Sequence, residues 1–416
     1  MDPVTHAASG ALLALALPVR ARSRWLVPLA ALAANAPDLD IFLGSTPEAF
    51  LALHRGVTHS LILLPLFALL LVPACAPLWR PRAPGSLSPP ACWLLCVACL
   101  ALHVWLDCIT TFGTMPFLPF SGERVRLNAA FIADPLLTVP ALLALIPAAR
   151  RARHARLAAG LGLAWLVAWP LMAMGANHLH GQSQLAALTA EGRAVRAAVV
   201  LPDIGSPLRS RLLFEETTPS GAIVRDRAMG PGGETLAELD ALPALDRKLA
   251  RGLAIQSAAC ARFLDFTILP VALPLPSAEL AGSGLAPLEL RERGLTPLLV
   301  HDLRFGSGVP AMRDLLARRP NAAVPFRLML VLGPDGAIVL ERLAFSDRRV
   351  DSGWRAALAA RGRGHPLVAP GSQLTRPLAA ARPAVYNQPT PPRTPTARTG
   401  KPPPSRRHNS PRRPRA

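Results

Sequence analysis

The first 175 residues alternate between apolar runs and short polar turns. The runs cover residues 7–19, 25–36, 60–79, 91–106, 135–149 and 157–175. A helix needs about 20 apolar residues to cross a hydrocarbon core of ~30 Å, and several runs approach that length. The first two are shorter, since about 13 helical residues reach only ~20 Å. The pattern predicts an α-helical integral membrane domain with about six membrane segments.

The pattern changes near His178, where shorter runs separated by Pro and Gly begin. Period-two alternation and turn residues predict strands, and one longer stretch, 242–266, predicts a helix in one or more pieces. The predicted strands cover residues 194–201, 211–216, 222–227, 297–304, 326–332 and 337–343. We therefore expect a soluble α+β domain after the membrane domain.

Residues 365–416 are rich in Pro and Arg and contain few core-forming side chains, which predicts a disordered tail. The expected organisation is a membrane-embedded domain at 1–176, a soluble α+β domain at 177–364, and this tail.

Composition supports a membrane protein, because 51% of the residues are hydrophobic and 17% are charged. The net charge of +19 comes in large part from the tail, and Lys occurs only at Lys248 and Lys401. A charge excess of this kind requires no nucleic acid, so we predict no specific nucleic-acid partner. Among the six Cys, no CxxC pair has a second such pair to complete it, so neither a disulfide framework nor a zinc knuckle is indicated.

Arginine-rich turns at residues 20–24, 80–82 and 150–156 fall on one side of the membrane if the six runs alternate. The positive-inside rule places that side in the cytoplasm. We therefore predict a multi-pass protein of the bacterial inner (plasma) membrane, with a periplasmic or extracytoplasmic soluble domain. Because the first two runs are short, we expect the helix end that carries Asp38 and Asp40 to lie below the outer surface of the membrane.

Acidic and imidazole side chains gather at the predicted outer ends of the runs. Ionisable groups beside lipid are costly enough to mark functional sites, and Asp and His bind Zn²⁺, Mn²⁺ or Fe. The potential metal ligands are His6, Asp38, Asp40, His54, His59, His103 and Asp107. Seven ligands exceed the needs of one ion, so the site is predicted to hold one or two divalent metal ions.

Further roles follow from position along the chain. Asp40 is our candidate general base, because it follows Asp38 closely enough to reach the same water molecule. Arg124 and Arg126 lie on the same predicted face and could bind a substrate anion such as a phosphate. The pair His301-Asp302 is interpreted as structural.

The order of these motifs resembles the YdjM-like family of inner-membrane, metal-dependent hydrolases, some of whose members are described as LexA-binding. The resemblance covers roughly residues 1–175 and extends weakly to residues 300–305. It is carried by Thr5-His6, Asn35-x-Pro-Asp-x-Asp40, His54-Arg-Gly-x-Thr-His-Ser60, His103-x-x-x-Asp107, Pro116-Phe117 with Pro119-Phe120, and Asp134-Pro135. It implies a membrane-bound metal centre.

We therefore expect a hydrolase that acts on a lipid-linked or envelope ester or phosphoester at the outer membrane interface, with membrane lipid as its surroundings. One alternative is a non-enzymatic membrane regulator with a structural metal, whose soluble domain binds a protein partner. A metal-ion transporter is a further alternative, since intramembrane Asp and His also mark ion paths. The clustering of ligands at one end of the helices argues against transport.

Overall fold

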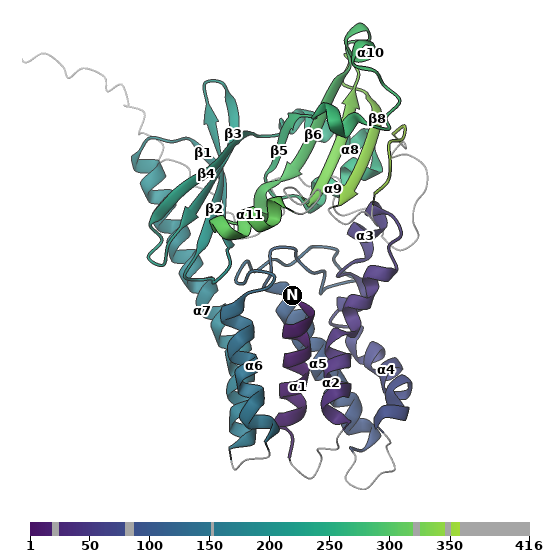
Figure 1. Cartoon of the computed structure of the whole chain (residues 1–416), viewed down its shortest axis with the longest axis vertical. Coiled ribbons are helices and arrows are strands. Elements are labelled where there is room, and N and C mark those ends of the chain that lie inside the picture. Colours follow the sequence, from purple (N-terminus) through teal and green to yellow (C-terminus); the bar gives the residue numbers. More distant parts are fainter. Residues whose placement is uncertain (19–24, 80–86, 151–153, 319–324, 346–350, 358–416) are drawn as a thin grey trace, which may run out of the picture.

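The computed structural model describes residues 1–357 except 19–24, 80–86, 151–153, 319–324 and 346–350. The predicted tail at 365–416 lies outside the described residues. The described chain forms a helical domain and, at one end of it, a domain that contains two β-sheets (Figure 1).

Each predicted apolar run contains a helix. The helices of this domain are α1 (Pro3–Ala16), α2 (Leu26–Asn35), α3 (Pro47–Leu53), α4 (Leu64–Trp79), α5 (Pro89–Cys108), α6 (Pro135–Ala149) and α7 (Ala155–Ala190). Two short 3₁₀ helices, η2 (Ala36–Phe42) and η3 (Val57–His59), connect them. Helix α5 packs against α1, α2 and α4, so its side chains form the centre of the domain.

The expectation of six membrane segments is not supported. Among the described residues, α5 and α7 are long and apolar enough to span a membrane, and a third span arises if the pair Pro47–His59 and Leu64–Ala74, bent by 84°, is counted as one. The apolar helices α1 and α6 have 14 and 15 residues, fewer than the ~20 that a span needs. The run 25–36 supplies only a 10-residue α2, because the chain tightens into η2 at Ala36-Pro37.

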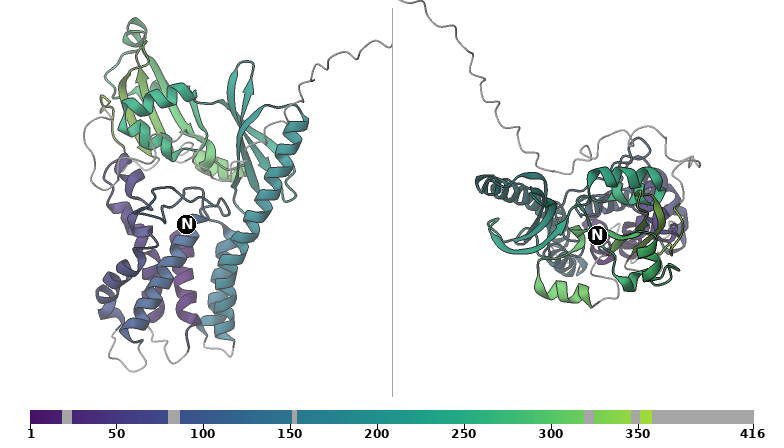
Figure 2. Two further views of the ribbon diagram at one scale, coloured as in Figure 1. Left: turned by 180° about the vertical axis from the view of Figure 1, so that it is seen from behind. Right: turned by 90° about the horizontal axis from the view of Figure 1, so that it is seen from above.

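Helix α7 joins the two domains. It runs for 36 residues without a break, along one flank of the helical domain and onto the first sheet (Figure 2). The predicted boundary at residue 176 therefore falls inside a helix. Near this point the amide of Asn177 donates to the carbonyl of Asn128 at 3.1 Å, and about two helical turns later Gln184 donates to Gly233 at 2.7 Å.

Two four-stranded antiparallel sheets form the second domain. The first has the order β1 (Val195–Pro202), β2 (Ser210–Thr218), β3 (Gly221–Met229) and β4 (Thr235–Pro243). The second has the order β5 (Pro270–Pro274), β6 (Thr296–Asp302), β7 (Phe326–Leu332) and β8 (Ile338–Phe345). Helices α8 (Arg247–Gln256), α9 (Ala258–Phe266), α10 (Pro287–Glu292) and α11 (Pro310–Ala317) accompany the sheets, with the 3₁₀ turns η4 (Ser277–Leu280) and η5 (Leu303–Phe305).

The six predicted strands are confirmed, and two further strands were missed. β4 contains two acidic residues and lies largely exposed, and β5 begins and ends with Pro, so neither shows a buried apolar alternation. The predicted helix at 242–266 resolves into α8 and α9, because Ser257 is extended and caps α9.

An aromatic cluster connects the second sheet to the helical domain. Phe266 of α9 packs on Phe112 with ring centroids 5.0 Å apart, and Phe345 of β8 packs on Phe50 of α3 at 5.3 Å. Arg355 adds an ion pair with Glu48 of α3. The second sheet therefore contacts the helical domain next to the turn that carries His54.

Candidate metal centre

The ends of α1, α2 and α5 that lie toward the sheet domain bring four predicted ligands together (Figure 1). Gly10 allows α1 and α2 to approach closely, since a Cβ there would lie 2.2 Å from the Ala30 oxygen. This approach sets His6 beside the start of η2, which carries Asp38. His103 and Asp107 are one helical turn apart on α5 and share a face.

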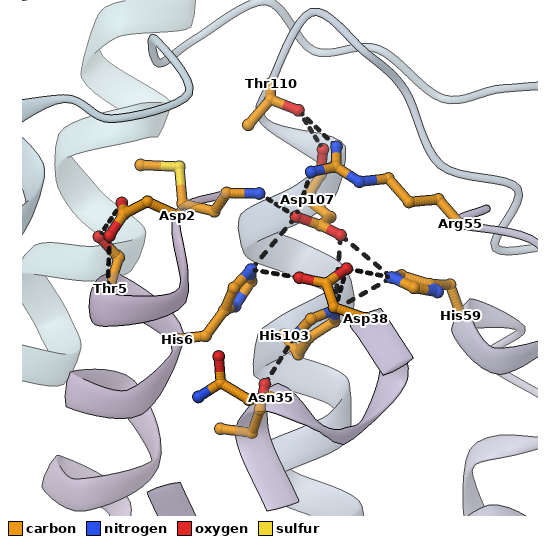
Figure 3. A network of polar contacts seen from close by, with 12 residues as sticks. Asp2, Thr5, His6, Asn35, Asp38, Arg55, His59, His103, Asp107 and Thr110 are labelled. Carbon is orange, nitrogen blue, oxygen red and sulfur yellow. Dashed lines mark hydrogen bonds and ion pairs between the residues drawn. The ribbon is translucent and has the colours of Figure 1, made fainter. Parts of the chain in front are cut away.

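Figure 3 shows His6, Asp38, His59, His103 and Asp107 pointing toward one another. Ligand atoms of His6, Asp38, His103 and Asp107 all lie within 4.8 Å of one another. His59 joins this group from η3, with its Nε2 at 3.1 Å from Asp107 Oδ2 and 3.0 Å from His103 Nε2. We call these five residues the primary cluster.

The tautomer of His103 is set by the backbone. Its Nδ1 lies 2.6 Å from the carbonyl oxygen of Ala34, which can only accept, so Nδ1 carries the proton. The neutral ring therefore directs the lone pair of Nε2 into the primary cluster. A backbone or carboxylate partner on the outer nitrogen is the usual companion of a metal-binding imidazole.

His59 is oriented in the same manner. The hydroxyl of Thr58 donates to Asp40 Oδ2 at 2.7 Å, so Nδ1 of His59, 2.9 Å from that hydroxyl, is the donor of the pair. The Nε2 atom of His59 then also faces the cluster, 3.1 Å from Asp107 Oδ2. Two imidazole Nε2 atoms and two carboxylates thus converge on one small volume.

Unpartnered atoms in the cluster show that this donor set suits a divalent metal ion. Among the described residues, neither ring nitrogen of His6 and not Oδ1 of Asp38 has a hydrogen-bond partner, although all three atoms are buried. Buried polar atoms are nearly always paired, and histidine nitrogens with carboxylate oxygens are ligands for Zn²⁺, Mn²⁺ or Fe. The Asp38 side chain is 23% exposed, whereas those of His6, His59, His103 and Asp107 are fully buried, so the cluster meets the surface at Asp38.

Asp40 and His54 form a second group beside the primary cluster. Asp38, Asp40 and His54 also offer ligand atoms within 4.8 Å of one another, so Asp38 is shared between the two groups. Asp40 is surrounded by donors, because it accepts from His54 Nδ1 at 2.6 Å, from the Arg55 N–H at 2.9 Å and from Thr58. These contacts favour an orienting role for Asp40, and its assignment as general base stays a prediction.

Electrostatic conditions at Asp38 and Asp40 favour the charged carboxylates. Burial raises the pKa of Asp38, but the nearby His59 and Arg55 side chains outweigh it and lower the pKa to about 2. The pKa of Asp40 is likewise held below its ordinary value, because the hydrogen bonds from His54 and His59 outweigh burial. Both groups are therefore ionised at neutral pH, as metal ligands must be.

Arg55 was not predicted, although it lies between His54 and Gly56 in a predicted motif. One guanidinium nitrogen lies 3.0 Å from Asp107 Oδ1, and another donates to Thr110 at 2.9 Å (Figure 3). The amino group of Met1 also contacts Asp107. The available signal was a charged residue inside a ligand motif.

Arg124 and Arg126 lie near the centre but are engaged elsewhere. Arg124 donates to the backbone carbonyls of Leu51, His54 and Gly113, and Arg126 donates to those of Phe112 and Phe266. Burial lowers the pKa of Arg124 to about 10 and that of Arg126 to about 9. Their predicted role in substrate binding is untested, and these contacts give both a structural role.

Within the pair His301-Asp302, Asp302 has the structural role that we interpreted from the sequence. Asp302 accepts from the N–H groups of Ile268 and Arg304, both at 2.9 Å, and thereby fixes the end of β6.

The helical domain is similar to known proteins. Residues 1–179 match the family model of the YdjM inner membrane protein. The chain is 33% identical over 121 residues to "Uncharacterized protein YfhP" of Bacillus subtilis (strain 168), and this alignment covers 29% of the chain and 36% of YfhP. The chain thus matches about a third of the length of that relative. No solved structure gives a significant match.

Proposed function

We propose that the N-terminal region, which belongs to the YdjM inner membrane protein family, is a metal-dependent hydrolase that acts on an ester or phosphoester of a lipid-linked or envelope substrate. The observation that carries this proposal is the convergence of the Nε2 atoms of His59 and His103, 3.0 Å apart, on the carboxylates of Asp38 and Asp107.

In this proposal His6, Asp38, His59, His103 and Asp107 hold one divalent ion, and His54 with the shared Asp38 supplies ligands for a second. When bound, such an ion polarises the substrate and lowers the pKa of water toward neutrality. The chain itself contributes orientation. The Ala34 carbonyl fixes His103, and Asp40 fixes both His54 and His59.

The surroundings of the cluster favour a substrate with an apolar part. Next to Asp38, the η2 side chains of Leu39 and Phe42 are 61% and 74% exposed, and Phe120 in a neighbouring loop is 81% exposed. Large exposed apolar side chains beside a polar site are typical of membrane or ligand contact. We therefore place the substrate's polar group at Asp38 and its apolar part along η2.

We also propose the topology predicted from the arginine turns, with several membrane crossings and the sheet domain on the outer side. The helix ends that adjoin residues 19–24, 80–86 and 151–153 lie at the end of the helical domain opposite the sheets (Figure 1). The primary cluster lies at the sheet end, beside the start of α1. The ligands therefore lie at one end of the helical domain and these helix ends at the other (Figure 1), which supports the proposed topology.

A second candidate is a non-enzymatic regulator with a structural metal and a protein partner on the sheet domain. The near-complete burial of four members of the primary cluster favours it, because structural metal sites are closed. The partial exposure of Asp38 favours the hydrolase.

Metal analysis of the detergent-purified full chain, followed by a screen of lipid phosphoesters and carboxylic esters with and without chelator, separates the two. Turnover that a chelator abolishes and added Zn²⁺ or Mn²⁺ restores supports the hydrolase. Stoichiometric metal without turnover of any substrate in the screen favours the regulator.

A further inference from the structure

Three arginines lie near the metal centre, and they differ in what their guanidinium groups contact. Arg124 and Arg126 donate to backbone carbonyls, as described above, and both are held there by burial. Arg55 alone of the three forms an ion pair with a member of the primary cluster, Asp107. Among these three arginines, Arg55 is therefore the one that lies beside the primary cluster.

The Arg55 guanidinium still has unused donors. A guanidinium carries five N–H groups in a planar fork. Described partners account for one nitrogen at Asp107 and one at Thr110, and the buried Nε has no hydrogen-bond partner in the described part of the chain. The side chain is 3% exposed and stacks over the Phe112 ring at 5.1 Å, which fixes the plane of the fork. A buried, immobilised cation with a free donor is a site for an anion.

The backbone around Arg55 is arranged to hold this position. Arg55 has a φ of 58°, a left-handed conformation that is unfavourable for a side chain of its size. The strain is sustained because Asp40 accepts the Arg55 N–H and because the Met115 N–H donates to the Arg55 carbonyl, both at 2.9 Å. Relaxing this conformation would carry the guanidinium away from Asp107. Strained backbone of this kind clusters at functional sites.

We propose that Arg55 binds a non-bridging oxygen of a tetrahedral phosphoryl group and thereby selects phosphoesters over neutral carboxylic esters. This inference rests on the proposed function, because it takes the metal centre as the place where the substrate binds. The planar guanidinium fork matches the oxygens of a phosphate better than an ammonium does. Asp107 contacts Arg55 and is also one of the residues that would hold the ion, so a phosphoryl group bound at the centre would lie near both positive charges.

The test measures binding of inorganic phosphate to the full-length, Zn²⁺- or Mn²⁺-loaded protein in detergent by titration calorimetry. Arg55→Asn removes the charge while Asn tolerates the left-handed backbone, and Arg55→Lys keeps the charge without the fork. Arg196→Gln, at an arginine whose side chain is 50% exposed in the sheet domain, is the control. Metal content is measured for each protein.

We expect phosphate affinity to fall on the order of 10- to 100-fold in Arg55→Asn and by a smaller factor in Arg55→Lys, with metal content retained. Arg196→Gln should bind phosphate as the unaltered protein does. Unchanged phosphate binding in Arg55→Asn overturns the proposal. Loss of metal together with phosphate binding in both variants also overturns it, since Arg55 would then serve only to hold the cluster.

The outcomes also separate this inference from the proposed hydrolase. Phosphate binding that depends on Arg55, without turnover of any ester, supports the inference and contradicts the hydrolase. Turnover of carboxylic esters by a loaded protein that does not bind phosphate supports the hydrolase and overturns the role of Arg55.

Discussion

The Nε2 atoms of His59 and His103 face each other at 3.0 Å inside the helical domain. Each ring is fixed from its other nitrogen, His59 through Thr58 and His103 through the Ala34 carbonyl, so neither can turn its Nε2 atom away. Two lone pairs at this distance repel unless a cation lies between them or a proton is shared. The pair therefore makes metal binding the first property to test.

Replacing His103 with Ala should reduce bound metal strongly, because it removes one Nε2 ligand and the contact with the Ala34 carbonyl. We expect at least a tenfold loss of affinity, the scale seen when even an outer partner of a metal ligand is removed. His154→Ala is the matched control, since His154 is an exposed residue at the start of α7. Metal content of purified folded protein is the measurement, and equal content in both variants would contradict the site.

Asp40→Asn distinguishes a base from an orienting carboxylate. Because Asp40 accepts from His54, Thr58 and the Arg55 N–H, we expect the substitution to disturb His54 and lower metal affinity about 10- to 100-fold. Metal affinity and turnover should be measured on the same protein. A retained metal with a rate lower by about 10²–10⁴ would instead assign Asp40 as the general base.

Much of the fold could be predicted because its elements follow local patterns. The apolar runs contain α1, α2, α4, α5, α6 and α7, and the alternating runs form six of the eight strands. The number of spans could not be predicted, because run length does not show where the backbone tightens, as it does at Ala36-Pro37. Nor could the strand β4 be predicted, since it pairs with β3 while keeping most side chains in solvent.

The residue types of the site could be predicted from the sequence, but the division of its ligands into two groups could not. Spacing on α5 places His103 and Asp107 on one face, and this local relationship holds in the structure. The division into a primary cluster and the Asp40–His54 pair depends on how η2 and η3 pack, which sequence separation does not reveal. For the same reason the role of Arg55 could not be predicted, because its contact with Asp107 joins residues that are far apart in the sequence.

The aromatic cluster between the domains should influence the metal centre. Phe112 lies between Phe266 of α9 and the ring of His54, at 5.0 and 5.2 Å. Phe266→Ala should therefore lower the free energy of unfolding by about 3–5 kcal/mol and also weaken metal binding. Phe214→Ala, at an equally buried ring of β2, is the control, with a comparable loss of stability and unchanged metal affinity. Equal metal affinity in both variants would show that the packing of the sheet domain does not affect the metal centre.

The proposed topology places residue 88 on the cytoplasmic side and residue 220 outside. Ser88 lies exposed at the start of α5, and Ser220 is exposed in the turn between β2 and β3, while the five cysteines that the structure describes are buried. A membrane-impermeant thiol reagent applied to spheroplasts should label Ser220→Cys and not Ser88→Cys. Permeabilised cells provide the control, because both should then react. Labelling of Ser88→Cys in sealed spheroplasts would reverse the topology.

Asp134 should make stability depend on pH at the junction of the domains. Its carboxylate caps α6 through the Leu136 N–H at 3.0 Å and accepts from the Ser206 N–H at 3.2 Å. Burial raises its pKa from 3.8 to about 6, so between these values the folded state holds a proton that the unfolded state has released. Its contribution to stability is therefore largest below pH 4 and is lost as pH rises through 6. Asp134→Asn cannot titrate, so the melting temperature of this variant should depend less on pH over this interval. Asp335→Asn is the control, because Asp335 is an exposed carboxylate that accepts from the Ala337 N–H at 3.0 Å in the same local geometry. This control should leave the dependence of the melting temperature on pH unchanged. Equal slopes in the Asp134→Asn variant and the unaltered protein would show that Asp134 titrates alike in the folded and unfolded states.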